Sequence, residues 1–174
     1  MTLQDKRVAI LVEDEFEDSE LLEPLKAMRE RGAQVTVVGS GAKDTYKGKR
    51  GATIRANTTA DKVEAQMFDA IIVPGGHAPD KMRLSQPMID LVKQAYAQGK
   101  VIAAICHGPQ LLISADILRG HTLTSWLSVA VDVKNAGANW VDQPVVKDGN
   151  LITSRKPADL PQFNQAIIET LATG

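Results

Sequence analysis

Short apolar runs rich in valine and isoleucine alternate along this chain with longer segments in which apolar residues recur every three or four positions. A short, uniformly apolar run is typical of a strand buried on both faces of a sheet, and the longer spacing is that of an amphipathic helix. This alternation predicts βαβ units and therefore an α/β fold with a mainly parallel central sheet. The expected strands are residues 8–12, 34–39, 69–73 and 101–105.

The rest of the sequence is consistent with a single domain. Residues 46–57 contain turn glycines and predict a hairpin, and Asp148-Gly149 joins a second pair of strands. Ser85 suits a helix N-cap, and apolar residues recur at helical spacing from there to Gln98. A chain of 174 residues without a linker, repeat or low-complexity segment predicts one domain spanning residues 1–174. Further helices are expected in residues 19–31, 128–135 and 159–171.

The charges of the chain almost cancel, because 20 Lys and Arg face 21 Asp and Glu for a net charge of −1. Without a basic field, we expect neither nucleic acid nor an anionic membrane as a partner. The run of residues 8–12 is shorter than a signal-peptide core, and no apolar stretch approaches the roughly 20 residues needed to span a bilayer. A single cysteine excludes an intrachain disulfide, so we expect a cytoplasmic protein.

Cys106 directly follows the apolar run of residues 101–105, and Gly108 and Pro109 come just after it. The carboxyl end of a central parallel strand faces the crevice in which open α/β sheets bind ligands. Gly108 allows a sharp turn and Pro109 suits the start of a helix, so the sulfur is expected beside unpaired amides. We therefore predict a nucleophilic thiolate whose pKa is well below the usual value of about 8.5. The alternative is a buried structural cysteine, the common role of a lone cysteine in an apolar strand.

The neighbours of this cysteine suggest further parts of a catalytic site. His107 is expected to act as a general base or as a charge that stabilises the thiolate, and the alternative is a helix cap. Gly75 and Gly76 end the strand of residues 69–73 at the same edge of the sheet. Their amides, together with the amide of His107, are expected to form an oxyanion hole, and the alternative is a plain turn.

The acidic residues 13–18 follow the first strand and are expected over the same crevice. Most of these carboxylates are expected to be solvated and to stabilise the N-terminus of the next helix. One that turned inward against Cys106 would stay protonated and donate a hydrogen bond to the sulfur. His77 and His121 show no ligand spacing relative to the cysteine, so we expect no metal. Trp126 is expected to serve in packing or as a pocket wall.

The segment AAICHGPQLL at residues 103–112 strongly resembles the cysteine elbow of the PfpI family, the intracellular protease I branch of the DJ/PfpI superfamily. The similarity extends over nearly the whole chain. No single motif is specific for the family, but the motifs together are. The resemblance implies a flavodoxin-like three-layer sandwich with the nucleophilic cysteine on its elbow. Supporting motifs are EFED at 15–18, PGGHAPD at 74–80, TSW at 124–126 and TSRKPADL at 153–160.

The same resemblance implies a role for each site residue. Cys106 is the nucleophile, His107 is its partner, and Glu17 is the carboxyl group that touches the sulfur. The third triad member comes from a neighbouring subunit, and the matching position is Asp80, where the family often has the longer glutamate. A homodimer or a higher homo-oligomer, up to a hexamer, is then expected, and no cofactor is implied.

The family resemblance implies three activities that share attack by a thiolate on an electrophilic carbonyl. These are peptidase activity, glyoxalase conversion of methylglyoxal to lactate, and deglycase repair of glycated amines and thiols. We expect a stress-protection enzyme of the glyoxalase or deglycase type, because a narrow crevice walled by Trp126 and a neighbouring subunit suits small carbonyl or glycated substrates. An intracellular cysteine peptidase acting on peptides is one alternative. A non-enzymatic redox sensor or stress chaperone, acting through oxidation of Cys106, is another.

Overall fold

The computed structural model describes all residues from Met1 to Gly174. At its centre lies a seven-stranded sheet in which six strands are parallel and one edge strand, β10, is antiparallel, so the predicted mainly parallel sheet is confirmed. In spatial order the strands are β10 (Val145–Asp148), β11 (Leu151–Ser154), β7 (Val101–Ile105), β6 (Ala70–Val73), β1 (Arg7–Val12), β2 (Gln34–Gly39) and β5 (Thr58–Thr59).

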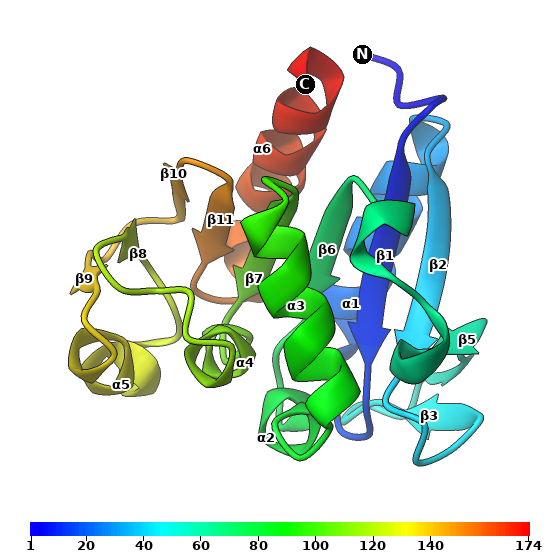
Figure 1. The fold of residues 1–174 in the computed structure, drawn as a ribbon, viewed down its shortest axis with the longest axis horizontal. Helices are drawn as coiled ribbons and strands as arrows, with labels where there is room; N and C mark the ends of the chain where they lie inside the picture. The colour runs from blue at the N-terminus through cyan, green and yellow to red at the C-terminus, as the bar shows by residue number, and fades with distance from the viewer.

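Helices cover both faces of this sheet and form a three-layer sandwich (Figure 1). The chain moves in opposite directions along the sheet from β1 to β2 and from β6 to β7, and right-handed crossovers therefore place α1 and α3 on opposite faces. Helix α1 packs against α6, and α3 packs against α4, which also contacts α2. The bounds are α1 (Asp18–Glu30), α2 (Ala78–Met82), α3 (Gln86–Ala97), α4 (Pro109–Ser114), α5 (Ala130–Asn135) and α6 (Leu160–Thr173).

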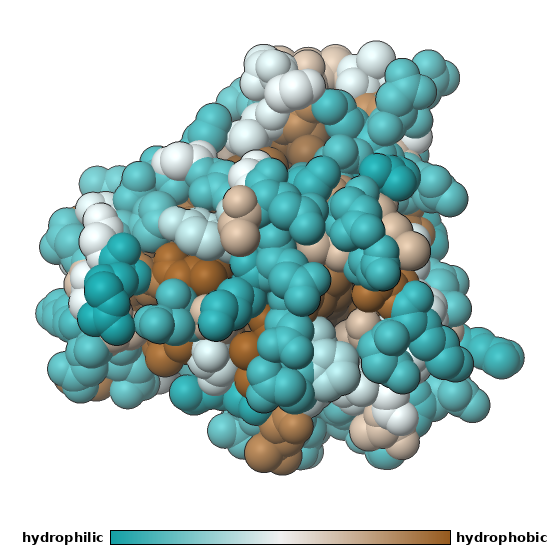
Figure 2. All heavy atoms as spheres, in the orientation of Figure 1, coloured by the Kyte–Doolittle hydropathy of each residue, from teal (hydrophilic) through white to brown (hydrophobic).

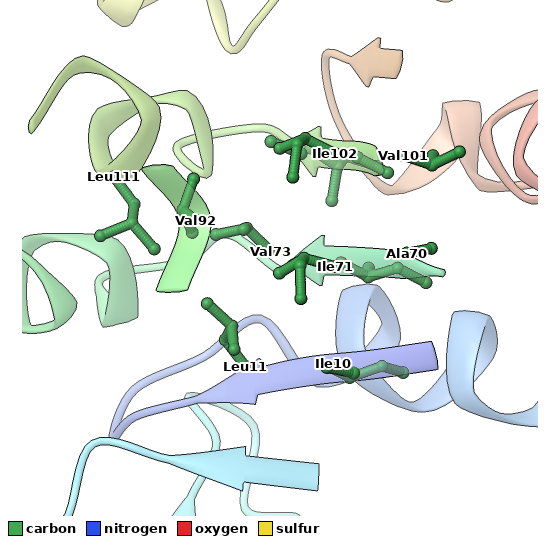
Figure 3. Close-up of a cluster of buried hydrophobic side chains, with 14 of the residues drawn as sticks. Ile10, Leu11, Ala70, Ile71, Val73, Val92, Val101, Ile102 and Leu111 are labelled. Atoms are coloured by element: carbon green, nitrogen blue, oxygen red, sulfur yellow. The ribbon is translucent and has the colours of Figure 1, made fainter. Parts of the chain in front are cut away.

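The core follows the predicted patterns. All five residues of β7 are buried, as expected for a central parallel strand. The side chain of Ser85 accepts the amide of Met88 and caps α3, as the sequence predicts. Figure 3 shows apolar side chains of β1, β6 and β7 gathered with Val92 and Leu111 from the covering helices. In Figure 2, hydrophilic side chains cover most of the viewed face, most apolar ones lie recessed between them, and one apolar group projects at the lower edge.

The smaller elements depart most from the expectations. The predicted hairpin is present as β3 (Thr45–Lys47) and β4 (Thr53–Arg55). After β6, where the sequence indicates only the glycines that end the strand, the chain forms the single-turn helix α2. The pair β8 (Thr122–Leu123) and β9 (Asn139–Trp140) forms a separate small sheet, and β9 was not predicted because two residues carry no periodicity. Short 3₁₀ turns occupy Ala60–Lys62, Ala65–Met67, Leu127–Val129 and Pro157–Asp159.

None of the helices combines the length and the apolar character that a bilayer crossing requires.

Candidate active site

Cys106 occupies a strained elbow between β7 and α4. Its φ of 63° lies in the left-handed region, which a non-glycine residue rarely adopts. Two backbone hydrogen bonds hold this conformation: the Cys106 amide donates to the Ser154 carbonyl at 3.0 Å, and its carbonyl accepts from the Trp126 amide at 2.9 Å. Such strain persists only where the surroundings impose it, and it is common at catalytic positions.

The residues after the cysteine make the elbow possible. A Cβ at Gly108 would come within 2.6 Å of the Val73 carbonyl oxygen, so only glycine lets the chain pass this close to β6. Pro109 then begins α4 at a position where no amide proton is needed. The sequence predicts this strand, turn and helix unit correctly.

The elbow lies beside the point at which the strand order of the sheet reverses, between β1 and β6. In open α/β sheets, ligands bind outside the carboxyl ends of the strands near this point. A cavity of about 310 Å³, here called the cysteine cavity, is present there. Its lining residues are Glu17, Glu20, Lys49, Arg50, Gly76, Cys106, His107, Trp126 and Pro157.

His107 is in hydrogen-bonding contact with the nucleophile candidate, because its Nδ1 lies 3.2 Å from the Cys106 sulfur. Its ring stacks on Trp126, with centroids 6.5 Å apart and an interplanar angle of 27°. Burial lowers the pKa of His107 below 6.5, and positive charge at His77 and Lys49 acts in the same direction. The imidazole is therefore neutral at pH 7, so it can accept the proton of the thiol.

The carboxyl group next to the sulfur belongs to Glu20, and the assignment of this contact to Glu17 was wrong. Glu20 is fully buried, and its Oε1 accepts the Gly75 amide at 2.8 Å. Burial raises its pKa to about 8, while the hydrogen bond from the Gly75 amide and the neighbouring Cys106 side chain oppose the rise, and its Oε2 has no hydrogen-bond partner. At neutral pH the group is thus a protonated acid that can donate a hydrogen bond to sulfur, as expected for an inward-turned carboxyl.

Glu17 faces the other wall of the cysteine cavity. Its carboxylate accepts Arg50 Nε at 2.8 Å and lies 3.7 Å from Lys49 Nζ, so two cations from the β3–β4 hairpin hold it away from the sulfur. The sequence does contain a signal for Glu20: it is four residues before Pro24 and eight before Met28, all on the buried face of α1. Lys49 and Arg50 were missed, because a hairpin of obscure function gave no reason to expect them at the site.

The expected oxyanion hole is only partly available. The Gly75 amide donates to Glu20, so in this arrangement it is not free to donate to an oxyanion. The amides of Gly76 and His107 instead act on the sulfur of Cys106, where they favour the thiolate. Gly76 has a φ of 80°, and a Cβ there would approach the Glu15 carbonyl oxygen to 2.5 Å, so the position requires glycine.

The thiol of Cys106 is not the strongly acidic group predicted from its place at a helix start. Burial is the largest influence and raises its pKa to about 12, and negative charge on Glu20 adds to the rise. The amides of Gly76 and His107 lower it. The repulsion from Glu20 disappears while that carboxyl is protonated, so the ionisations of Glu20 and Cys106 are coupled. Deprotonation of the thiol then relies on the neutral His107 beside it.

Asp80 lies in α2 and lines a polar hollow of about 360 Å³ together with His107 and Gln110 of the same chain. No hydrogen bond joins Asp80 to His107 within the chain. No group of three or more His, Cys, Asp or Glu side chains is arranged to hold a metal ion.

Comparison with known proteins places these features among relatives. Residues 6–170 match the family model described as the DJ-1/PfpI family. The chain is 45% identical over 168 residues to Protein/nucleic acid deglycase 2 of Escherichia coli (strain K12), covering 95% of this chain and 98% of that protein. It is 38% identical over 165 residues to Deglycase PfpI of Pyrococcus furiosus, covering 95% and 99%.

Solved structures show the same fold. Drosophila melanogaster DJ-1beta superposes with a TM-score of 0.90 at 32% sequence identity, and the match covers 100% of this chain and 92% of the DJ-1beta chain. A two-domain protein of Anabaena variabilis, with DJ-1/ThiJ/PfpI-like and ferritin-like domains, gives a TM-score of 0.94 at 46% identity. The match covers 96% of this chain and 48% of that protein.

Proposed function

This chain belongs to the DJ-1/PfpI family, and from that premise we propose that it is a cysteine-dependent deglycase that releases amines or thiols from adducts with reactive dicarbonyls such as methylglyoxal. The observation that carries the proposal is the grouping of Cys106, neutral His107 and protonated Glu20 around one cavity of about 310 Å³. A nucleophile, a base and an acid are thus within reach of one small substrate.

The first step removes the amine from an adduct of the form R–NH–CH(OH)–CO–CH₃. The sulfur of Cys106 forms a bond to the carbinol carbon, and the bond from that carbon to nitrogen breaks. His107 Nδ1, 3.2 Å from the sulfur, takes the thiol proton and passes it to the departing nitrogen. The products are the free amine and a hemithioacetal on Cys106.

Glu20 then moves protons between the two oxygen-bearing carbons. It gives its proton to the ketone oxygen, and its carboxylate takes the proton of the carbinol carbon, which leaves an ene-diol. It next returns a proton to the former ketone carbon and takes one from the other hydroxyl, so that a lactoyl thioester remains and Glu20 is again protonated. Water hydrolyses this thioester to lactate and frees Cys106. A pKa near 8 suits both roles.

The dimensions of the cysteine cavity favour a small substrate over a polypeptide. Trp126, stacked on His107, forms one wall, and the Glu17, Lys49 and Arg50 cluster forms another. An extended peptide needs a groove that continues on both sides of the nucleophile. This difference supports deglycase activity over peptidase activity.

A single assay tests the proposal. Purified protein is mixed with the methylglyoxal adduct of N-acetyl-lysine, and lactate and free amine are measured together; a casein peptide is tested in parallel. We expect the wild type to release one lactate for each amine. Glu23→Gln, which changes an exposed side chain on α1, should do the same, and Cys106→Ala should release neither product. Cleaved peptide without lactate would establish the peptidase alternative. If Cys106 became oxidised and neither lactate nor cleaved peptide formed, the result would support the redox-sensor alternative.

We further propose that Asp80 orients His107 of a neighbouring subunit and that each active site is completed in an oligomer. A carboxylate in that position would fix the tautomer of the imidazole and favour its protonated form during the reaction. The support is the match of Asp80 to the family pattern, together with the absence of any hydrogen bond between Asp80 and His107 within the chain, although both line the same polar hollow.

A further inference from the structure

A second, larger hollow lies beside the cysteine cavity. It has a volume of about 590 Å³ and is lined by four lysines and one histidine, with two carboxylates and a single hydrophobic residue. We call it the lysine hollow. Its charged lining residues are Lys43, Lys47, Lys49, Lys81, Asp14 and Glu15, and its histidine is His77.

Two routes connect the lysine hollow with the nucleophile. Lys49 lines both the lysine hollow and the cysteine cavity. The polar hollow near Asp80 shares His77 and Lys81 with the lysine hollow, and it shares His107 with the cysteine cavity. The three depressions therefore adjoin one another, and one elongated ligand can contact Cys106 and the lysines together.

Some cations of the lysine hollow have no internal partner. Lys43 forms an ion pair with Asp14, so these two charges cancel. The ammonium groups of Lys47 and Lys81 make no hydrogen bond or ion pair within the chain, and Lys47 is exposed. When Glu15 is counted as well, four lysines face two carboxylates in the lining, so positive charge is left over at this place although the whole chain carries a net charge of −1.

The boundary between the two hollows carries a further excess of positive charge. Glu17 is the single carboxylate partner of both Lys49 and Arg50. Only the Nε of the Arg50 guanidinium is used in this contact, and the side chain of Arg50 is 70% exposed. Its remaining N–H groups are free to donate to an anion that bridges the two hollows.

We propose that the lysine hollow binds the phosphate group of a phosphorylated substrate whose glycated carbon reaches Cys106. This inference rests on the proposed deglycase function and assigns it a substrate class. Phosphate is the favoured anion, because it carries more than one negative charge and accepts hydrogen bonds at three oxygens, which matches several lysine ammonium groups. A phosphorylated small amine and a nucleotide both present this group.

The kinetic test uses pairs of substrates that differ only in a phosphate. Methylglyoxal adducts of ethanolamine and O-phosphoethanolamine form one pair, and adducts of guanosine and its 5′-monophosphate form the other. For the wild type we expect a KM about tenfold lower for the phosphorylated member, with similar kcat. In the double variant Lys47→Gln/Lys81→Gln this preference falls to about twofold or less. The double variant Lys62→Gln/Lys93→Gln, which removes exposed lysines elsewhere, retains it. If only one of the two pairs shows the lower KM for its phosphorylated member, that pair shows whether the substrate is a phosphorylated small amine or a nucleotide.

A binding measurement separates this inference from the deglycase proposal. Pyrophosphate is titrated into the wild type and the Lys47→Gln/Lys81→Gln variant by calorimetry at low salt. We expect saturable binding to the wild type and at least tenfold weaker binding to the variant. Binding of this kind without turnover of any adduct would retain the anion site and reject the deglycase function. Turnover of the neutral adducts with no phosphate preference and no pyrophosphate binding would overturn the lysine hollow alone.

Discussion

Replacement of Glu20 by glutamine should change how the stability of the protein depends on pH. Burial raises the pKa of Glu20 from an ordinary value of 4.5 to about 8. The gap between these values, at about 1.4 kcal/mol per pH unit, corresponds to roughly 5 kcal/mol of folding free energy linked to this one proton. Coupling to Cys106 reduces the measurable part, so roughly 5 kcal/mol is an upper bound.

The sign follows from which state holds the proton. Between pH 4.5 and 8 the folded protein keeps Glu20 protonated, whereas the unfolded chain loses that proton. The stabilisation from the raised pKa is fully present below pH 4.5 and is lost as the pH rises through 8. Glutamine is neutral throughout and lacks this dependence. The wild type should therefore lose several kcal/mol relative to Glu20→Gln between pH 5 and 8.

Urea unfolding of both proteins at pH 5, 6, 7 and 8 measures this difference. The contributions of most other titrating groups to the unfolding free energy are the same in both proteins and cancel in the comparison. Glu23→Gln is the matched control on α1, since its side chain is exposed, and its stability should stay parallel to the wild type. If the wild-type and Glu20→Gln curves also stayed parallel across this range, Glu20 would not be a buried, protonated acid.

Three further predictions test other parts of the site. Gly108→Ala should destabilise the protein by about 2 kcal/mol or more and abolish turnover, because the added methyl would lie 2.6 Å from the Val73 carbonyl oxygen; urea unfolding and lactate release measure both effects. The kcat/KM for adduct turnover should fall at low pH as His107 becomes protonated, because burial lowers its pKa and keeps the imidazole neutral at pH 7; a kcat/KM that rose as the pH dropped through this range would contradict a neutral base. Mixing the inactive variants Cys106→Ala and Asp80→Ala should restore activity as subunits exchange, because some interfaces then combine an intact Cys106 with an intact Asp80; demonstrated exchange without recovery would exclude a shared site.

The sequence predicts the central sheet and the cysteine elbow well, because both depend on local patterns. Buried parallel strands appear as continuous apolar runs, and the elbow requires a glycine and a proline at fixed positions after Cys106. The short elements β9 and α2 escape such patterns, because a two-residue strand and a single-turn helix are fixed by tertiary contacts.

The errors in the site come from contacts between segments far apart in the sequence. Glu17 and Glu20 both follow the first strand, and only the packing of α1 decides which of them turns inward. The Gly75 amide is used by Glu20, a bond between residues 55 positions apart. The predicted acidity of Cys106 rested on the helix start, His107 and an acidic neighbour, whereas burial is the larger influence on its pKa.

In the proposed mechanism, Cys106 forms the covalent intermediate, and Glu20 moves the protons that convert it to a lactoyl thioester. Intact-mass spectrometry after rapid mixing with the N-acetyl-lysine adduct, with lactate measured in parallel, tests this claim directly. The wild type should show a transient mass increase of one three-carbon dicarbonyl unit on Cys106, followed by lactate. Glu20→Gln should accumulate a species of the same mass, because the hemithioacetal and the thioester are isomers. It should release little lactate, because glutamine cannot move the protons that convert one into the other. Lactate release from Glu20→Gln at the wild-type rate, or turnover by the wild type without modification of Cys106, would contradict the mechanism.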